Sequence, residues 1–264
     1  MLIMRKKYRY FIIAAVSIIL GLTFATKLIF NSEPAQKSVL LVGVVSQNKP
    51  YSWHNQKKQL IGFDIELAKK IAKKNNMQAR FITGSRKRLY SKFEHGKIQL
   101  LFLNQSPAAL KKDSYYKTDT YLYQPNVLIT LSDHKISDLD NLVNYRIALS
   151  NHLNVPPTLQ GKHIKFSRYS QSQKMLHAVL EKKVRAAVMS DYAYSAALQK
   201  EPLLSAELSK NAPFPPIVSQ KIFGITSTNK TLLYKINTSL KTLEEDGTLA
   251  KLSQKFFNQD WSKQ

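Results

Sequence analysis

One stretch of the sequence determines the expected fold: Leu60-Ile61-Gly62-Phe63-Asp64-Ile65-Glu66-Leu67-Ala68-Lys69-Lys70-Ile71-Ala72-Lys73-Lys74. Gly62 allows a backbone turn that a residue with a Cβ would resist. Asp64 can cap the amide groups of a helix that starts there, and its charge suits the positive helix end. Lysines fill one face of the stretch, whereas the other face carries apolar residues at helical spacing: Ile65, Ala68, Ile71 and Ala72. The stretch therefore predicts an amphipathic helix.

Strand patterns lie on both sides of this helix. Residues 39–45 form a β-branched run of the kind found in buried strands, and residues 78–82 follow the helix as a second strand. The order strand, helix, strand is a βαβ unit, which implies a parallel sheet. Residues 86–97 are predicted to form another helix, which Gly96 stops, and residues 98–103 a further buried strand.

A second α/β unit follows from residue 126 onward. Its predicted strands are residues 126–130, 146–149, 164–166 and 184–189, with helices around residues 175–180 and from 192 to about 199. Residues 217–226 have a long strand pattern that could cross back to the first unit, and the tail is helical with a break at Asp246-Gly247. Two crossings between two units make a two-segment hinge, and a cleft between lobes is a natural site for a small ligand.

The composition limits the function classes. The 264 residues contain no cysteine, which excludes disulfides, thiolate metal sites and a cysteine nucleophile. The formal net charge is +23, from 40 Lys and Arg against 17 Asp and Glu. The lysines are spread along polar helix faces and no nucleic-acid-binding motif is present, so we expect no nucleic-acid partner. We also expect no cofactor, no bound metal and a monomeric chain.

The N-terminus has the layout of an export signal. Arg5, Lys6, Lys7 and Arg9 precede an almost wholly apolar run, residues 11–24. Residues 1–30 are therefore interpreted as either a cleaved signal peptide or an uncleaved membrane anchor, because about 20 apolar residues can also span a bilayer. Residues 31–38 are a polar linker. In both cases the rest of the chain is exported, to the periplasm of a Gram-negative-type envelope.

Six segments stand in a characteristic order and spacing along the chain. They are Pro50-Tyr51-Ser52-Trp53, Leu60-Ile61-Gly62-Phe63-Asp64-Ile65-Glu66-Leu67-Ala68, Gly96-Lys97-Ile98, Ser137-Asp138-Leu139-Asp140-Asn141-Leu142, Val184-Arg185-Ala186-Ala187-Val188-Met189-Ser190-Asp191 and Leu243-Glu244-Glu245-Asp246-Gly247-Thr248-Leu249-Ala250-Lys251-Leu252. Together they resemble the family 3 extracellular solute-binding proteins, the periplasmic components of polar amino-acid ABC transporters. The resemblance implies an α/β type II periplasmic binding protein, with lobe 1 formed by residues 39–125 plus 223–264 and lobe 2 by residues 126–222.

The same resemblance implies two ligand contacts. Tyr51 matches the aromatic that family members usually stack on the ligand, and Asp191 matches the acid that usually holds the ligand's ammonium group. Trp53 lies in the same strand-end loop as Tyr51 and is a further candidate, since ligands bind at the carboxyl ends of parallel strands. The alternatives are that Trp53 packs under its loop and that Asp191 caps the helix that follows it.

Two segments depart from the family pattern. Members that bind amino acids generally carry Thr-Pro-Glu-Arg, whose arginine clamps the ligand carboxylate, where this chain has Ser106-Pro107-Ala108-Ala109. A Gly-Thr loop of lobe 2 is replaced by Ser150-Asn151-His152. Ser106, Ser150 and Asn151 are therefore candidate ligand contacts. Arg86, which falls near the position of a pocket aromatic in many members, could supply the missing guanidinium or could lie in solvent with its basic neighbours.

Three functions are weighed. The first is a solute-binding protein that captures an amino acid or related amine in an interlobe cleft for an inner-membrane ABC permease. The second keeps the scaffold as an envelope sensor or adaptor that does not take part in transport. The third is a dehydratase-like enzyme, but no pair of acids or histidines stands at a spacing that indicates acid–base catalysis, so the sequence favours a protein that is not an enzyme.

Overall fold

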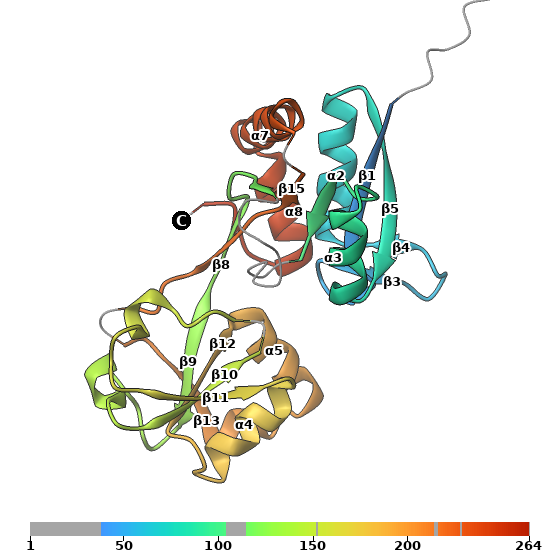
Figure 1. The fold of residues 1–264 in the computed structure, drawn as a ribbon. Coiled ribbons are helices and arrows are strands. Elements are labelled where there is room, and N and C mark those ends of the chain that lie inside the picture. The colour runs from blue at the N-terminus through green and yellow to red at the C-terminus, as the bar shows by residue number, and fades with distance from the viewer. Residues whose placement is uncertain (1–37, 104–114, 152, 214–215, 228, 264) are drawn as a thin grey trace, which may run out of the picture. The chain divides into compact units, whose positions relative to one another are not determined.

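The computed structural model describes residues 38–103, 115–151, 153–213, 216–227 and 229–263. The chain divides into two units, Met1–Ser38 and Val39–Gln264, and the elements described here belong to the second, except that the first strand begins at Ser38. Within the described residues there are two five-stranded mixed sheets with helices packed on them (Figure 1). Their strand orders are β5-β1-β6-β15-β7 and β11-β10-β12-β9-β13.

The first sheet is built around the predicted βαβ unit. β1 and β6 are parallel, with Val42 opposite Leu100, whereas β15 runs antiparallel to β6. The strands are β1 Ser38–Val45, β5 Met77–Gly84, β6 Leu100–Phe102, β7 Tyr116–Lys117 and β15 Ile225–Thr226. The helices are α2 Phe63–Lys74, α3 Arg86–Glu94, α7 Lys230–Glu245 and α8 Thr248–Phe257. The C-terminal helices α7 and α8 share a core with α2 and β1, so the tail packs with the first unit.

Helix α2 confirms the prediction from residues 60–74, with one correction. Its N-cap is Gly62, with φ of 136°, a backbone conformation that is essentially reserved for glycine. Asp64 does not cap the helix: it lies inside the first turn, is fully buried and accepts the Tyr121 hydroxyl at 3.5 Å. The first amide groups of α2 are instead satisfied by the preceding loop, because Phe63 N donates to Pro50 O at 3.0 Å and Asp64 N to Tyr51 O at 2.9 Å.

The second sheet contains the predicted strands of the second unit. β10 is parallel to β11 and β12, whereas β9 is antiparallel to β12. The strands are β9 Asn126–Leu131, β10 Arg146–Ser150, β11 Lys165–Tyr169, β12 Ala186–Ser190 and β13 Leu208–Asn211. The helices are α4 Ser172–Leu180, α5 Asp191–Lys200 and the short α6 Leu204–Glu207, with 3-10 turns η2 Leu139–Leu142 and η3 Pro157–Leu159.

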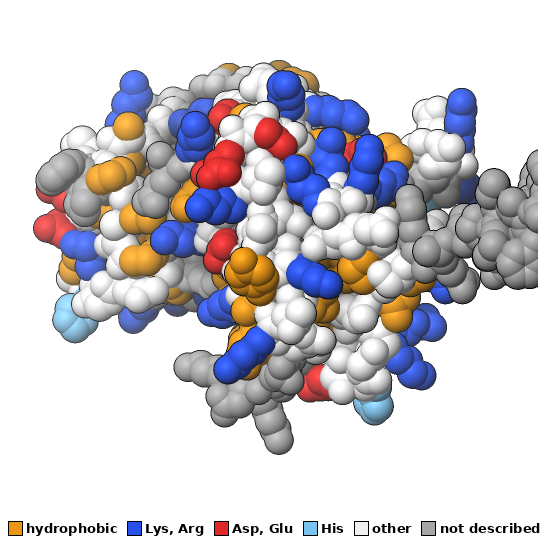
Figure 2. Space-filling view, turned by 90° about the horizontal axis from the view of Figure 1, so that it is seen from above, with side chains coloured by type: hydrophobic (Ala, Val, Ile, Leu, Met, Phe, Trp, Pro, Cys, Tyr) orange, Lys and Arg blue, Asp and Glu red, His pale blue; other side chains and the backbone are white. Residues whose placement is uncertain are grey.

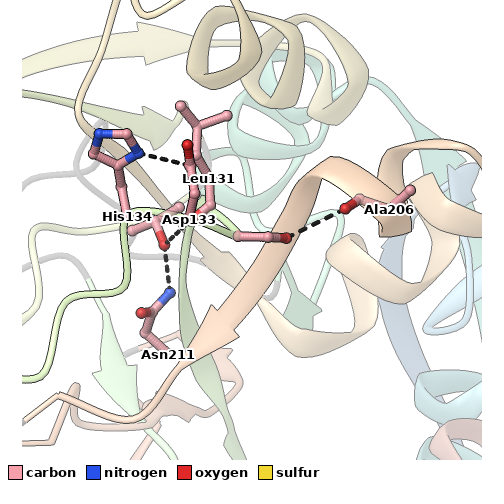
Figure 3. A network of polar contacts seen from close by, with 7 residues as sticks. Leu131, Asp133, His134, Ala206 and Asn211 are labelled. Carbon is pink, nitrogen blue, oxygen red and sulfur yellow. Dashed lines mark hydrogen bonds and ion pairs between the residues drawn. The ribbon is translucent and has the colours of Figure 1, made fainter.

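Strand β13 has no clear signal in the sequence, and polar contacts explain its place. Asn211, which is labelled in Figure 3, donates to Thr130 Oγ1 at 2.7 Å. It also accepts from Ile136 N at 2.7 Å. Since the segment Leu-Ser-Lys-Asn is short and mostly polar, its pairing with β9 depends on these long-range bonds more than on an apolar pattern.

The predicted long strand over residues 217–226 is wrong. The structure has two short strands there, β14 Gln220–Ile222 and β15, separated at Gly224. Gly224 N donates to the Thr118 hydroxyl at 2.9 Å, so the backbone leaves the strand ladder at this point. β14 pairs with β8 Leu122–Gln124 in a separate two-stranded sheet, which carries two of the connections between the five-stranded sheets.

The remaining strands frame the loop that precedes α2. β2 Gln47–Asn48, β3 Ser52–His54 and β4 Leu60–Ile61 form a three-stranded antiparallel sheet. Lys and Arg side chains are scattered over the face seen in Figure 2, interspersed with acidic and neutral groups. Among the described residues no helix has the length and apolarity needed to cross a membrane, and the predicted signal or anchor, residues 1–30, lies outside them.

Candidate functional site

A cavity of about 290 Å³, here called the Arg86 cavity, is lined by the loop after β1, by α3, by the β8–β14 pair and by strands and helices of the second five-stranded sheet. The loop after β1 contributes Tyr51, and α3 contributes its first residue, Arg86. Ser150 and Ser190 are the last residues of the parallel strands β10 and β12. Ligands of open α/β sheets bind outside the carboxyl ends of their strands, and both serines occupy that position.

Tyr51 is held in this wall by its backbone and its hydroxyl group. Its carbonyl accepts an α2 amide, its ring packs 5.2 Å from that of Phe257, and its hydroxyl donates to Gln124 Oε1 at 2.6 Å. Burial raises the pKa of the Tyr51 hydroxyl well above its usual range, and the nearby charge of Asp64 adds to this. Tyr51 therefore stays neutral and offers the cavity an aromatic side chain that cannot turn freely.

Gln124 and Gln220 form the part of the lining that comes from the connecting strands. They are directly opposite each other in the β8–β14 pair. Gln124 lies in one of the two chain segments that connect the five-stranded sheets, and Gln220 lies in the other. Any change in the geometry of these segments therefore moves groups that line the cavity. The Tyr51–Gln124 hydrogen bond joins the loop after β1 to the same strands.

Arg86 is the most desolvated cation of the cavity. Its Nε atom is buried and has no hydrogen-bond partner within the described part of the chain, although Arg86 is the first residue of a helix rich in exposed charges. Burial lowers the pKa of the Arg86 guanidinium from its ordinary value, and the neighbouring Tyr90 acts in the opposite direction. Of the two interpretations of Arg86, the structure therefore favours a residue that lines a cavity.

Two helices of the second sheet begin at the Arg86 cavity. Ser172 and Gln173 are the first residues of α4, and Tyr192 and Ala193 lie in the first turn of α5. Helix α5 is capped by Ser190, whose hydroxyl accepts from Ala193 N at 3.2 Å. Helix α4 has no side-chain cap. Helix N-termini carry a partial positive charge, so this wall of the cavity favours negative groups.

A second cavity of about 540 Å³, the Trp53 cavity, shares Lys49, Tyr192 and Ala196 with the first. Trp53 lines it and packs edge-on against Phe256, with ring centroids 6.2 Å apart. Asp191 also lines it, and its carboxylate accepts from Lys210 Nζ at 2.9 Å. Asp191 is the first residue of α5, and Ser190 rather than Asp191 is the N-cap.

The chain matches a protein-family model over residues 40–259, and that model describes the bacterial extracellular solute-binding proteins, family 3. The chain belongs to this family. It is therefore a solute-binding protein of the extracellular or periplasmic kind, and membership agrees with the expectation that it is not an enzyme. The two mixed α/β sheets are typical of the type II periplasmic binding protein fold.

Similar proteins cover nearly the whole chain. The probable amino-acid-binding protein YxeM of Bacillus subtilis is 28% identical over 238 residues, which are 87% of this chain and 88% of that protein. A probable amino-acid ABC transporter-binding protein of Haemophilus influenzae is 23% identical, covering 84% of this chain and 85% of that protein. The L-cystine solute receptor of Neisseria gonorrhoeae, in its unliganded open conformation, superposes with a TM-score of 0.64 at 21% identity, over 86% of this chain and 96% of that one.

The predicted contacts of this solute-binding protein separate into two groups. Tyr51, Arg86 and Ser150 line the Arg86 cavity, whereas Trp53 and Asp191 line the Trp53 cavity. Asn151 is exposed and its amide donates to Tyr169 O at 2.8 Å, which continues the strand pairing of β10. Ser106 lies outside the described residues.

The sequence-based prediction missed several lining residues of the Arg86 cavity. Those with polar side chains are Asn48, Lys49, Gln124, Ser170, Ser172, Gln173, Ser190, Tyr192, Lys200 and Gln220. A usable signal existed for Ser190 and Tyr192, since both lie beside Asp191 at a strand end. Gln124 and Gln220 stand in the two predicted crossings, but the strand pattern there does not tell which side chains face a ligand.

A metal-binding cluster is also absent from the described residues. No cluster of three or more His, Asp and Glu residues is arranged there to hold a metal ion. His134 pairs with its neighbour Asp133 at 2.6 Å on an exposed turn after β9, in the network of Figure 3, and neither residue lines the Arg86 cavity.

Proposed function

We propose that this protein captures a small polar solute of the amino-acid class in the Arg86 cavity and delivers it to an inner-membrane ABC permease. The names of the similar proteins, which describe amino-acid binding and amino-acid ABC transport, support this solute class. Tyr51, Arg86 and Ser150 are the proposed contacts. Trp53 and Asp191 border the neighbouring Trp53 cavity, and Asp191 pairs with Lys210 there.

One observation carries the proposal: a polar cavity at the ends of β10 and β12 is also lined by the loop after β1, by the start of α3 and by the two strands that connect the five-stranded sheets. In this proposal the sheets belong to two lobes, residues 39–125 plus 223–264 and residues 126–222, and β8 and β14 are the hinge between them. A solute that contacts both lobes would bias such a hinge toward the bound arrangement, which is the property that a permease could recognise.

Residues 1–30 fit the same function as an export signal or as an anchor to the inner membrane, with residues 31–38 as the linker. Either form places the binding lobes outside the cytoplasm, in the periplasm of a Gram-negative-type envelope. Mass spectrometry of the N-terminus in the native host distinguishes them, since an anchor retains residue 1 and a cleaved signal does not.

A thermal-shift screen of proteinogenic amino acids, related amines and small organic acids tests the proposed solute class. A ligand that binds only the folded state increases the free energy of unfolding, by about 2.7 kcal/mol at 100 times Kd, and so raises the unfolding midpoint with its concentration. We expect at least one amino acid or derivative to produce a saturable shift, and Tyr51→Ala to reduce it. A screen in which no member of these classes changes the midpoint at millimolar concentration would contradict the proposal.

A further inference from the structure

The charge of the Arg86 cavity identifies a narrower solute class. Three cations, Lys49, Arg86 and Lys200, line the cavity, and no Asp or Glu lines it among the residues that the structure describes. Within the same residues none of the three cations takes part in an ion pair. The described part of the lining therefore offers positive charge to a ligand and no carboxylate for an ammonium group.

Arg86 has the strongest need for an anion. A guanidinium that has lost part of its hydration and has a buried Nε without a partner is unfavourable, and a carboxylate is the group that best matches its planar donors. Lys49 differs, because its ammonium lies 5.5 Å from the centre of the Trp53 ring. The N-termini of α4 and α5 add partial positive charge to the same cavity.

Asp191, the residue that the sequence suggested for an ammonium group, is engaged elsewhere. Its carboxylate is 15% exposed, pairs with Lys210 of β13 and lines the Trp53 cavity instead. A ligand ammonium in the Arg86 cavity would find no contact with Asp191, because Asp191 does not line that cavity and already pairs with Lys210. The pair Asp191–Lys210 is thus a structural element of the second sheet, and it leaves the net charge of the Arg86 cavity positive.

Asp64 is the acid that acts on the Tyr51 side of the cavity. It is fully buried in the first turn of α2, where the helix end favours its negative charge, and it accepts the Tyr121 hydroxyl. Its influence on the pKa of Tyr51 shows that its charge is felt nearby. With no exposed surface, however, it cannot contact a solute in the cavity.

We propose that the solute is a small organic anion with a net negative charge, whose carboxylate contacts Arg86 and which needs no ammonium group for binding. This inference rests on the proposed function of the same cavity. The expected class includes acidic amino acids and their N-acylated or 2-oxo derivatives. Basic amino acids are excluded, because a second cation would face Lys49, Arg86 and Lys200 without a counter-charge.

Isothermal titration of the full chain with pairs of solutes that match in shape and differ by one negative charge tests the class. The pairs are glutamate and glutamine, aspartate and asparagine, and N-acetylglutamate and N-acetylglutamine, with arginine and lysine as cations. We expect the more negatively charged member of the best-binding pair to bind at least about 10-fold more tightly than its amide, which is the difference made by one charge-assisted contact. Neutral or cationic members that bind as tightly as the anions would overturn the inference and leave the proposed function intact.

Three variants connect the class to its residue. Arg86→Gln should weaken binding of the anion by about 10- to 100-fold. Arg88→Gln removes the same charge from the exposed face of the same helix and should leave the affinity unchanged. Asp191→Asn should change it less than about 3-fold, since no ammonium contact is lost. An unchanged affinity in Arg86→Gln, or a large loss in Asp191→Asn, would refute the assignment. If no member of the panel binds the folded protein, the proposed function fails together with this inference.

Discussion

Replacing Gly62 with alanine tests the connection between the fold-determining helix and the cavity. The φ angle of 136° at Gly62 lies in a region that a residue with a Cβ occupies only with strain. An added Cβ would also collide with the carbonyl oxygen of Tyr51 and would lie 2.6 Å from its carbonyl carbon and 2.9 Å from Ser52 Cα. The obstacle is backbone, which cannot move without disturbing the N-terminus of α2.

The expected loss of stability has two parts. The unfavourable backbone conformation costs about 1–3 kcal/mol. Moving the Tyr51 carbonyl away from the added methyl group breaks or weakens the bonds from Phe63 N to Pro50 O and from Asp64 N to Tyr51 O, at about 0.5–1.5 kcal/mol each. The free energy of unfolding should therefore fall by about 2–6 kcal/mol, which is a large share of the stability of an ordinary domain.

Urea unfolding followed by far-UV circular dichroism measures this loss, and Gly96→Ala is the matched control. Gly96 also has a positive φ, of 69°, but a Cβ there would meet nothing within 4 Å. The control therefore contains backbone strain without a collision, and should lose about 1 kcal/mol. Equal losses in the two variants would refute the reasoning that the Tyr51 carbonyl makes Gly62 necessary.

Two further predictions concern buried polar groups. Burial raises the pKa values of the Tyr51 and Tyr121 hydroxyls in the folded protein, so the unfolded chain loses these protons first as pH rises above about 10, and the stability present below that pH is progressively lost. The free energy of unfolding, measured with urea, should therefore fall between about pH 8 and about pH 11, and it should fall less in the double variant Tyr51→Phe/Tyr121→Phe. The exposed control Tyr234→Phe should show no smaller fall than the unchanged protein. Lys210→Ala should lower the free energy of unfolding by about 1 kcal/mol in the same assay, because it leaves Asp191 unpaired. Lys183→Ala, which breaks a solvent-exposed pair with Glu181, should cause no measurable loss. Equal losses in the two variants would contradict the expected difference between these pairs.

The sequence predicted those parts of the fold that depend on local pattern. The amphipathic spacing in α2, the glycine after α3 and the break at Asp246-Gly247 all mark real helix boundaries. The prediction failed where distant contacts decide. β13 depends on the bonds of Asn211 to Thr130 and Ile136, and the interruption of residues 217–226 depends on the Thr118 hydroxyl. The bonded residues are far apart in the sequence in both cases, so no local pattern could indicate these contacts.

The site was less predictable than the fold for a related reason. Position at a strand end pointed to Tyr51, Ser150 and Asp191, but it could not tell which cavity each would line. Asp191 follows its strand as expected, yet its side chain meets Lys210, a residue of the strand that the sequence did not reveal. The proposed solute class depends on this pairing, which no pattern in the sequence indicates.

Tyr51 is the residue at which fold and recognition meet. Its carbonyl accepts an α2 amide, so its backbone belongs to the element that determines the fold, while its side chain borders the Arg86 cavity and bonds to Gln124 in a connecting strand. The conformation of Gly62 thus affects a wall of the cavity through one peptide group. Arg86 and Gln173 lack this backbone connection. Both lie in the first turn of ordinary helices, α3 and α4, whose backbone conformation does not require a particular side chain at these positions. If the Arg86 cavity binds the solute as proposed, specificity can change at those positions without altering the scaffold, whereas a change around Gly62 alters both.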